Sequence, residues 1–242
     1  MKLIVITAEI FFEGEAEAVN LLFENGLEVL HIRKPYASQR ETELFIGQIN
    51  KNFHSRIVIH DYYGLTKLFD LKGIHLNRRN QETDVELPKI CHNRHCPSLR
   101  GTKQSIRKQH HCEKTVFLEA TLCETANEGF SISRSCHSLD EVSESRFYDY
   151  VFLSPIFDSI SKEGYKQGFT SEQLNKAKVR KIIDGRVIAL GGITAENIFM
   201  ANSYGFGGVA VLGDLWSGFA VGRNVNALLK RFSEMKFKCN MV

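Results

Sequence analysis

Two short apolar stretches late in the chain, each ending in glycine, limit the possible folds more than any other feature. The first reads VIALGG at 187–192 and the second reads GVAVLG at 208–213. Continuous apolar runs of this length are typical of strands buried on both faces of a parallel sheet. Thr194 and Asn197 follow the first stretch at the spacing of an N-cap and the first turn of a helix. The pattern therefore predicts parallel strands connected by helices.

The glycines that close these stretches also suggest a ligand. Glycine lets a backbone approach a ligand closely, and the start of a helix offers unpaired N–H groups to an anion. In a (β/α)8 barrel, a phosphate is commonly held after the last two strands. We therefore predict that Gly191, Gly192 and Gly213 bind a phosphate. The alternative is that these glycines only form tight turns.

The rest of the chain alternates strand and helix patterns, which favours a single (β/α)8 TIM barrel over residues 1–242. An open doubly wound sheet is the alternative, and it is disfavoured because no GxGxxG follows the first strand. Besides the two glycine-ended strands, strands are expected at 3–7, 27–33, 56–60, 73–77, 131–135 and 148–153. Helices are expected at 15–25, 40–49, 65–71, 139–145, 171–178 and 225–237.

The segment 81–129 interrupts this regularity and is predicted to be an insertion after the fourth strand. It is polar, rich in His and Cys, and too long for an ordinary connection. Its residues 115–120 fit either a strand or a helical turn. The insertion could be a lid over the active site, a segment without function, or a tetrahedral zinc site, although the spacing matches no standard zinc finger. The zinc ligands would come from Cys91, His92, His95, Cys96, His110, His111, Cys112 and Cys123.

Composition excludes several classes of partner. The formal net charge of +3 is small and scattered, which argues against nucleic acid and against a membrane surface. No apolar run approaches the roughly 18 residues of a membrane span. The first ten residues, MKLIVITAEI, lack the pattern of a signal peptide, so we expect a cytoplasmic protein whose six cysteines are reduced thiols.

Active sites of such barrels lie where the strands end, and those positions supply the candidate residues. Arg33 could bind an anion or form a salt bridge, and Lys162 could bind an anion or be an ordinary loop lysine. His137 could be an acid–base group, or it could belong to a helix start in which Ser138 is the N-cap and Glu141 completes a capping box. The full set of strand-end residues is His31, Arg33, Lys34, His60, Asp61, 77–80, Ser135, Cys136, His137, 154–162, Gly191, Gly192 and Gly213.

Taken together, these motifs resemble the thiamine phosphate synthase/TenI family. The resemblance rests on Arg33 after an apolar strand, SRSCHSLDEV at 133–142, DYVFLSPIFDSISKEG at 149–164, VIALGGIT at 187–194 and GVAVLG at 208–213. It covers nearly the whole chain apart from the irregular segment. It implies a barrel enzyme that acts on a thiazole phosphate in thiamine biosynthesis, and it implies that the three glycines hold that phosphate through backbone N–H groups.

Two activities occur in this family, and the synthase needs Mg²⁺ held by carboxylates to ionise a pyrimidine diphosphate. The synthase pattern has Gln-x-Arg-x-Lys after the second strand, where this chain has His31 and Pro35 in place of Gln and Lys. Asp61 keeps one carboxylate of the pattern, whereas Asn80 replaces the other. Lys34 is a neighbouring lysine that could reach a diphosphate instead.

The TenI-like branch is a thiazole tautomerase, which needs no metal and no other cofactor, and the chain resembles this branch more closely. The resemblance implies that His137 transfers the proton, since imidazole titrates near working pH. Arg33 would bind the substrate carboxylate or phosphate, Ser135 would donate a hydrogen bond, and Lys162 would hold a phosphate oxygen or carboxylate. The alternatives are a Mg²⁺-dependent synthase using Asp61 and a non-catalytic thiazole phosphate binding protein. A homo-oligomer is expected.

Overall fold

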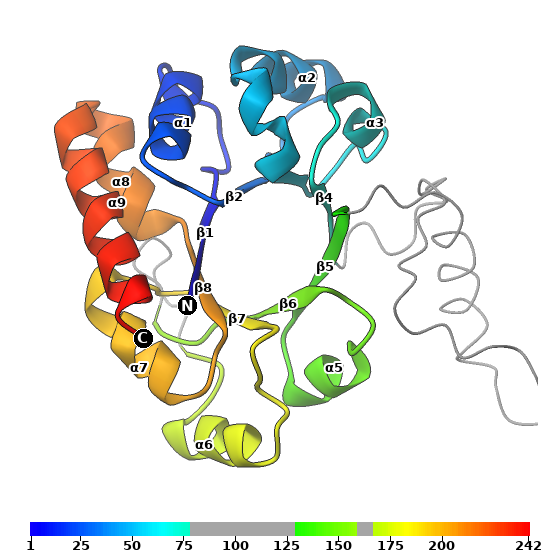
Figure 1. Cartoon of the computed structure of the whole chain (residues 1–242), viewed down its shortest axis with the longest axis vertical. Helices are drawn as coiled ribbons and strands as arrows, with labels where there is room; N and C mark the ends of the chain where they lie inside the picture. Colours follow the sequence, from blue (N-terminus) through cyan, green and yellow to red (C-terminus); the bar gives the residue numbers. More distant parts are fainter. Residues whose placement is uncertain (78–128, 159–166) are drawn as a thin grey trace, which may run out of the picture. The chain divides into compact units, whose positions relative to one another are not determined.

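Eight parallel strands close into a barrel with helices around its outside (Figure 1). The structure, a computed structural model, describes residues 1–77, 129–158 and 167–242. Within these residues the predicted (β/α)8 fold is confirmed. The predictions made for the His- and Cys-rich segment 81–129, and for Lys162, lie outside the described residues.

The strands follow one another around the barrel in chain order, and β1 closes the ring by pairing with β8. All eight pairings are parallel. Their carboxyl ends therefore meet at one edge of the barrel, where the candidate residues lie. The strands are β1 Lys2–Ile6, β2 Val29–Ile32, β3 Ile57–Ile59, β4 Gly73–Leu76, β5 Ser131–Cys136, β6 Tyr150–Leu153, β7 Val187–Leu190 and β8 Gly208–Val211.

The α-helices lie where the sequence analysis expected helices or a helix start, with one exception. Gly213–Gly222 forms α8, a helix that the sequence did not predict because its three glycines lower helix propensity. Burial of Leu215, Trp216 and Phe219 stabilises it. The other helices are α1 Glu15–Glu24, α2 Gln39–Gln48, α3 Leu65–Phe69, α5 Leu139–Glu144, α6 Ser171–Val179, α7 Ile198–Ser203 and α9 Val225–Asn240, with 3-10 turns η1 Lys51–Arg56 and η2 Ala195–Asn197.

The interior of the barrel has an apolar part and a polar part. The apolar part is a cluster from strands β1, β6, β7 and β8, made of Ile4, Ile6, Tyr150, Phe152, Ile188 and Ala210. The polar part comes from β2, β4 and β5 and includes His31, His75 and Ser133, all fully buried. His31 on β2 contacts the Phe152 ring on β6, with centroids 4.8 Å apart. Because β2 and β6 are not neighbouring strands, this contact can only cross the interior.

A buried ion pair joins the end of β2 to the start of α1. Lys34 Nζ lies 2.5 Å and 2.7 Å from the two carboxylate oxygens of Glu15, and both side chains are about 1% exposed. The Lys34 ammonium also lies 4.3 Å from the centre of the Phe11 ring. Burial raises the pKa of Glu15 and lowers the pKa of Lys34, and the partner's charge offsets only part of each change. The Lys34 ammonium is thus buried in its ion pair with Glu15, so the expectation that Lys34 could reach a diphosphate is wrong.

Breaking this pair should destabilise the barrel more than removing it entirely. Lys34→Met leaves the Glu15 carboxylate buried without its cation, and we expect the free energy of unfolding to fall by about 3–5 kcal/mol. The double variant Lys34→Met/Glu15→Leu should regain most of that loss, because no charge stays buried. Urea unfolding at pH 7 measures both. A single variant within about 1 kcal/mol of wild type, or a double variant no more stable than the single one, would contradict this account.

Within the described parts of the chain, no helix combines the length and the apolar character needed to cross a bilayer.

Candidate active site

Arg33 is the first candidate residue on the rim of the barrel, directly after β2. Its backbone N–H donates to Thr7 Oγ1, and its Nη1 donates to the Glu9 carboxylate at 2.7 Å. The side chain of Arg33 is 29% exposed, so the guanidinium is held in place and still reaches solvent. The salt bridge considered from the sequence is therefore present. It leaves four of the five guanidinium N–H donors for other contacts.

Ser135 is connected to the polar interior through His75. The Ser135 hydroxyl lies 2.8 Å from His75 Nε2, and the Ser133 hydroxyl lies 2.8 Å from His75 Nδ1. His75 thus bridges two serines on the neighbouring strand β5. Burial, and then the nearby Arg33 cation, lower the pKa of His75 to about 3. The ring is therefore neutral at physiological pH.

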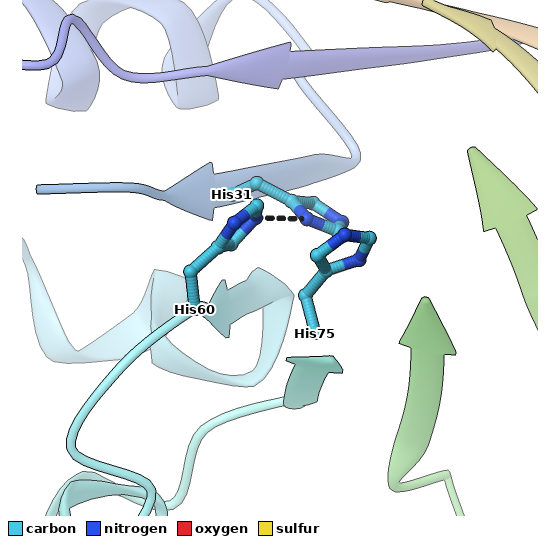
Figure 2. Close-up of side chains that lie close together, drawn as sticks. All are labelled: His31, His60 and His75. Atoms are coloured by element: carbon cyan, nitrogen blue, oxygen red, sulfur yellow. Dashed lines mark hydrogen bonds between the residues drawn. The ribbon is translucent and has the colours of Figure 1, made fainter. Parts of the chain in front are cut away.

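His75 also belongs to a cluster of three buried histidines inside the barrel, together with His31 and His60 (Figure 2). The hydroxyl of Tyr150 lies 2.6 Å from His31 Nε2, and His31 Nδ1 lies 3.0 Å from His60 Nε2. Burial raises the pKa of Tyr150, so the hydroxyl keeps its proton and can donate a hydrogen bond to His31 Nε2. His31 Nδ1–H then donates to His60. The sequence analysis placed His31 and His60 among the strand-end candidates for the active site, and the structure shows that both are buried.

This three-histidine cluster is not arranged as a preformed metal site. The candidate nitrogen atoms lie within 4.8 Å of one another. This limit is compatible with the roughly 3.3–3.4 Å between nitrogens bound to tetrahedral zinc, so the orientation of the rings decides the question. The His60 and His75 rings are stacked, with centroids 4.2 Å apart, so their in-plane lone pairs do not converge on one point. Both ring nitrogens of His31 and of His75 already have hydrogen-bonding partners.

The buried neutral histidines should make the fold sensitive to acid. Burial also lowers the pKa of His31 well below its usual value, with the nearby His75 adding to the effect. In the unfolded chain these imidazoles titrate near 6.5. Between that pH and the folded-state pKa, which is about 3 for His75, the unfolded chain binds more protons than the folded chain. The contribution of these histidines to the free energy of unfolding should be fully present above pH 6.5. It should fall as pH decreases, by up to about 1.4 kcal/mol per pH unit for each histidine.

Urea unfolding between pH 7 and pH 4 measures this slope, and His75→Gln is the matched variant. Glutamine can still hydrogen-bond to the two serines but does not titrate, so its slope should be shallower even if its stability at pH 7 is lower. Equal slopes for the two proteins would show that His75 does not cause the acid sensitivity.

His137 lies one residue beyond β5, with an exposed side chain. Its Nδ1 lies 3.2 Å from the backbone carbonyl oxygen of Ser154, at the end of the neighbouring strand β6. A carbonyl oxygen only accepts hydrogen bonds, so this contact favours a proton on Nδ1 and a lone pair on Nε2, whereas the Ser154 hydroxyl, 3.4 Å from the same Nδ1, could donate to it in the other tautomer. The Glu141 carboxylate accepts the backbone N–H of His137, and Ser138 is the N-cap of α5 as predicted. The imidazole is thus held at Nδ1 by Ser154 without being buried.

Gly191 and Gly192 follow β7 and both have left-handed backbone conformations, with φ of 93° and 63°. A Cβ on Gly192 would lie 2.2 Å from the carbonyl oxygen of Asp158, and a Cβ on Gly191 would lie 2.9 Å from Pro155. The backbone N–H of Phe157 donates to the carbonyl of Gly191 at 3.0 Å. These glycines are therefore required by close packing on the loop after β6. Tight packing explains their presence whether or not a phosphate binds.

The two late strand ends lie side by side, since β7 pairs with β8. Thr194 is the N-cap of η2, and its hydroxyl and the Asn197 side chain form the predicted capping interaction. Gly213 is the first residue of α8, where the first backbone N–H groups have no partner within the helix. The unpredicted helix α8 thus adds a second helix start to this part of the rim.

The structure therefore brings most of the candidate residues to one edge of the barrel. Arg33, Ser135, His137, Gly191, Gly192 and Gly213 follow or end strands β2, β5, β7 and β8. Asp61 lies on the same edge, two residues after β3, while Lys162 and Asn80 lie outside the described residues. The sequence reading missed the roles of His75 and Tyr150. Histidine and tyrosine within otherwise apolar strands were the available signal for a hydrogen-bonded interior.

Comparisons with known proteins identify relatives in sequence and in fold. A family model described as thiamine monophosphate synthase (TMP-TENI) matches residues 111–215. The crystal structure of thiamine phosphate pyrophosphorylase from Bacteroides thetaiotaomicron is 35% identical, covers 100% of this chain and 98% of its own, and superposes with a TM-score of 0.73.

Two more distant proteins are also similar. A thiamine-phosphate synthase from Caldicellulosiruptor bescii is 21% identical over 200 residues, which are 80% of this chain and 74% of that protein. Thiamine phosphate pyrophosphorylase from Pyrococcus furiosus is 18% identical, with 99% and 96% coverage and a TM-score of 0.65, a likeness that concerns the fold alone.

Proposed function

The chain belongs to the thiamine phosphate synthase/TenI family of enzymes, and from this premise we propose that it is a metal-independent thiazole tautomerase. The observation that carries the proposal is the exposed His137 at the rim of the barrel, whose Nδ1 is held by Ser154 so that Nε2 is left for the substrate. The substrate would be a non-aromatic thiazole that bears a carboxylate and a phosphate. The product would be the aromatic thiazole carboxylate phosphate.

The reaction needs one base that can return the proton it removes. Nε2 of His137 would take the proton from the ring carbon bearing the carboxylate, which breaks one C–H bond. The resulting imidazolium would be stabilised by the Nδ1–H bond to the Ser154 carbonyl. Nε2 would then return the proton to the exocyclic carbon, which forms one C–H bond and completes the aromatic ring.

The remaining candidate residues would bind the two anionic groups of the substrate. Arg33, already oriented by Glu9, would pair with the carboxylate, and the Ser135 hydroxyl would hydrogen-bond nearby. Backbone N–H groups at Gly191, Gly192 and Gly213 would hold the phosphate. Lys162 is proposed to contact a phosphate oxygen or the carboxylate, on the resemblance of the sequence alone.

Thiamine phosphate synthase is the second candidate, because the curated relatives carry that name. The synthase would need Mg²⁺ to neutralise a diphosphate leaving group. The chain keeps one carboxylate of the synthase pattern, Asp61, and has the neutral Asn80 at the other position. The nearby Lys34 is held by Glu15. Asp61, Asn80 and Lys34 therefore suit Mg²⁺ and a diphosphate less well than His137 suits proton transfer.

One pair of reactions separates the two candidates. The protein is incubated with the non-aromatic thiazole carboxylate phosphate in EDTA, and separately with thiazole phosphate, the pyrimidine methyl diphosphate and Mg²⁺. We expect aromatisation in the first reaction and no thiamine phosphate in the second, both followed by chromatography. Thiamine phosphate that disappears in Asp61→Asn would instead support the synthase.

Replacing His137 tests the proposed mechanism directly. His137→Asn should reduce the rate constant of aromatisation by a factor of about 10² or more, because the base is lost. The Kd for the product should stay within about threefold of wild type, since the phosphate and carboxylate contacts are separate. Ser138→Ala is the control, because it removes the α5 cap beside His137 and should lower stability by about 1 kcal/mol while turnover persists. Unchanged turnover in His137→Asn would refute the assignment.

A further inference from the structure

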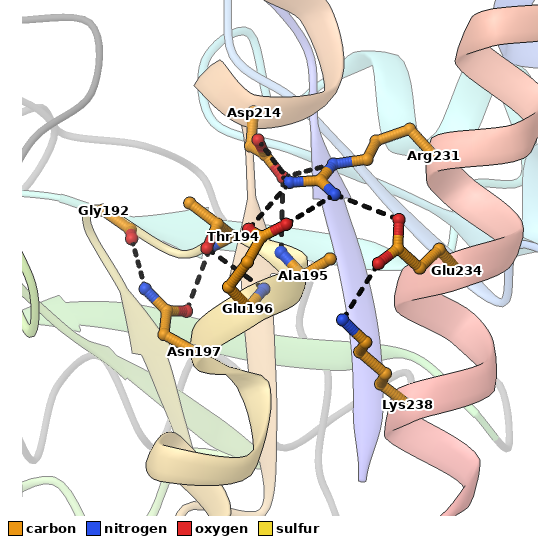
Figure 3. Close-up of polar contacts among 9 residues, drawn as sticks. All are labelled: Gly192, Thr194, Ala195, Glu196, Asn197, Asp214, Arg231, Glu234 and Lys238. Carbon is orange, nitrogen blue, oxygen red and sulfur yellow. Dashed lines mark hydrogen bonds and ion pairs between the residues drawn. The ribbon is translucent and has the colours of Figure 1, made fainter.

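Arg231, in the middle of α9, uses its whole guanidinium group to bind three carboxylates (Figure 3). Nε and Nη2 each donate to Asp214 at 2.9 Å, and Nη1 and Nη2 each donate to Glu196 at 2.9 Å. A second N–H of Nη1 donates to Glu234 at 3.1 Å. Guanidinium has five N–H donors, so each one is matched with a carboxylate oxygen. Because every N–H donor is paired and the side chain is only 26% exposed, the position and orientation of the Arg231 guanidinium are fixed by these carboxylates.

Two of these carboxylates stand at the strand ends where the phosphate is proposed to bind. Asp214 directly follows Gly213 in the first turn of α8, and Glu196 lies in η2, four residues after Gly192. Asp214 Oδ2 also lies 3.4 Å from the backbone N–H of Ala195 at the start of η2. Asp214 therefore reaches across from the β8 end to the β7 end. We call Arg231, Asp214 and Glu196 the arginine clamp.

An acidic residue at this place should oppose phosphate binding. The start of a helix attracts anions, and a carboxylate in the first turn competes for the same N–H groups and repels a second anion. Hydrogen bonds from Arg231 lower the pKa of Glu196 to about 2, so that carboxylate stays ionised at neutral pH. Its charge is therefore balanced by Arg231 and not by a proton.

We infer that Arg231 is a positioning residue for the substrate phosphate. From helix α9 it neutralises the charges of Asp214 and Glu196, and by binding both it holds the ends of β7 and β8 together. The inference rests on the proposed function, because it concerns the same phosphate site. Arg231 does not touch the substrate. It makes the N–H groups of Gly192 and Gly213 available to an anion despite the two acidic residues beside them.

A purely structural role for Arg231 makes a different prediction. If the clamp only tied α9 to the barrel, Arg231→Met would already break the tie, and the further loss of the Asp214 charge would not restore binding of the phosphate ligand relative to the thiazole alcohol. If the clamp neutralises charge, removal of the Asp214 charge should compensate for the loss of Arg231. Asp214→Asn keeps the shape of the side chain and removes its charge, so the double variant separates the two roles.

Titration calorimetry with thiazole phosphate measures the effect, and the thiazole alcohol without phosphate serves as the reference ligand. Arg231→Met should raise the Kd for thiazole phosphate about tenfold, which corresponds to about 1.4 kcal/mol. Arg231→Met/Asp214→Asn should recover most of this loss. Binding of the thiazole alcohol should change less than twofold in every variant. Lys238→Met is the matched control, because it removes a cation from the same helix that binds Glu234, a residue outside the arginine clamp. Its Kd for thiazole phosphate should stay within twofold of wild type.

The outcomes distinguish this inference from the proposed function. A wild-type chain that fails to bind thiazole phosphate would overturn both. Wild-type binding with an unaffected Arg231→Met, or with a double variant no better than the single one, would overturn the clamp alone. If Arg231→Met does not unfold cooperatively on heating, Asp214→Asn decides the question by itself. It should bind thiazole phosphate at least as tightly as wild type, and binding more than threefold weaker would contradict charge neutralisation.

Discussion

The closed barrel depends on the hydrogen bonds that satisfy its polar interior. A closed parallel barrel must fill its centre with side chains, and a buried polar group without a partner costs free energy. Here β2, β4 and β5 contribute imidazoles and hydroxyls where aliphatic side chains are usual. They remain compatible with the core because Tyr150, His31 and His60 form one hydrogen-bonded chain, and Ser133, His75 and Ser135 form another. Neutral imidazoles make this possible, since each ring offers one donor and one acceptor.

The second chain of hydrogen bonds ends at the catalytic edge, so the core and the site are not independent. Ser135 is both a candidate substrate ligand and a partner of His75. The Arg33 cation contributes to the low pKa of His75, which places a charged rim residue close to the same ring. The orientation of the Ser135 hydroxyl is therefore set by the interior beneath it.

The sequence predicted the barrel well because the buried strands are continuous apolar runs and the helices carry regular apolar faces. It also predicted the caps at Thr194 and Ser138, which depend on local spacing. The helix α8 could not be predicted, because glycine disfavours a helix locally and only the burial of Trp216 and its neighbours compensates. The Lys34–Glu15 pair and the arginine clamp were missed for another reason. Each joins residues distant in the chain, and the spacing of charges along a sequence does not reveal which side chains meet.

The close packing of Gly191 and Gly192 on 155–158 has a consequence for the geometry of the whole site. The segment that these glycines contact begins beside Ser154, whose carbonyl oxygen orients His137. In the proposed function, the phosphate of the substrate and His137 Nε2, which removes its proton, would thus both be positioned by the same short stretch of backbone. In that case the length of the ligand between its phosphate and its ring would be matched by main chain, which would select substrates by size without a dedicated side chain.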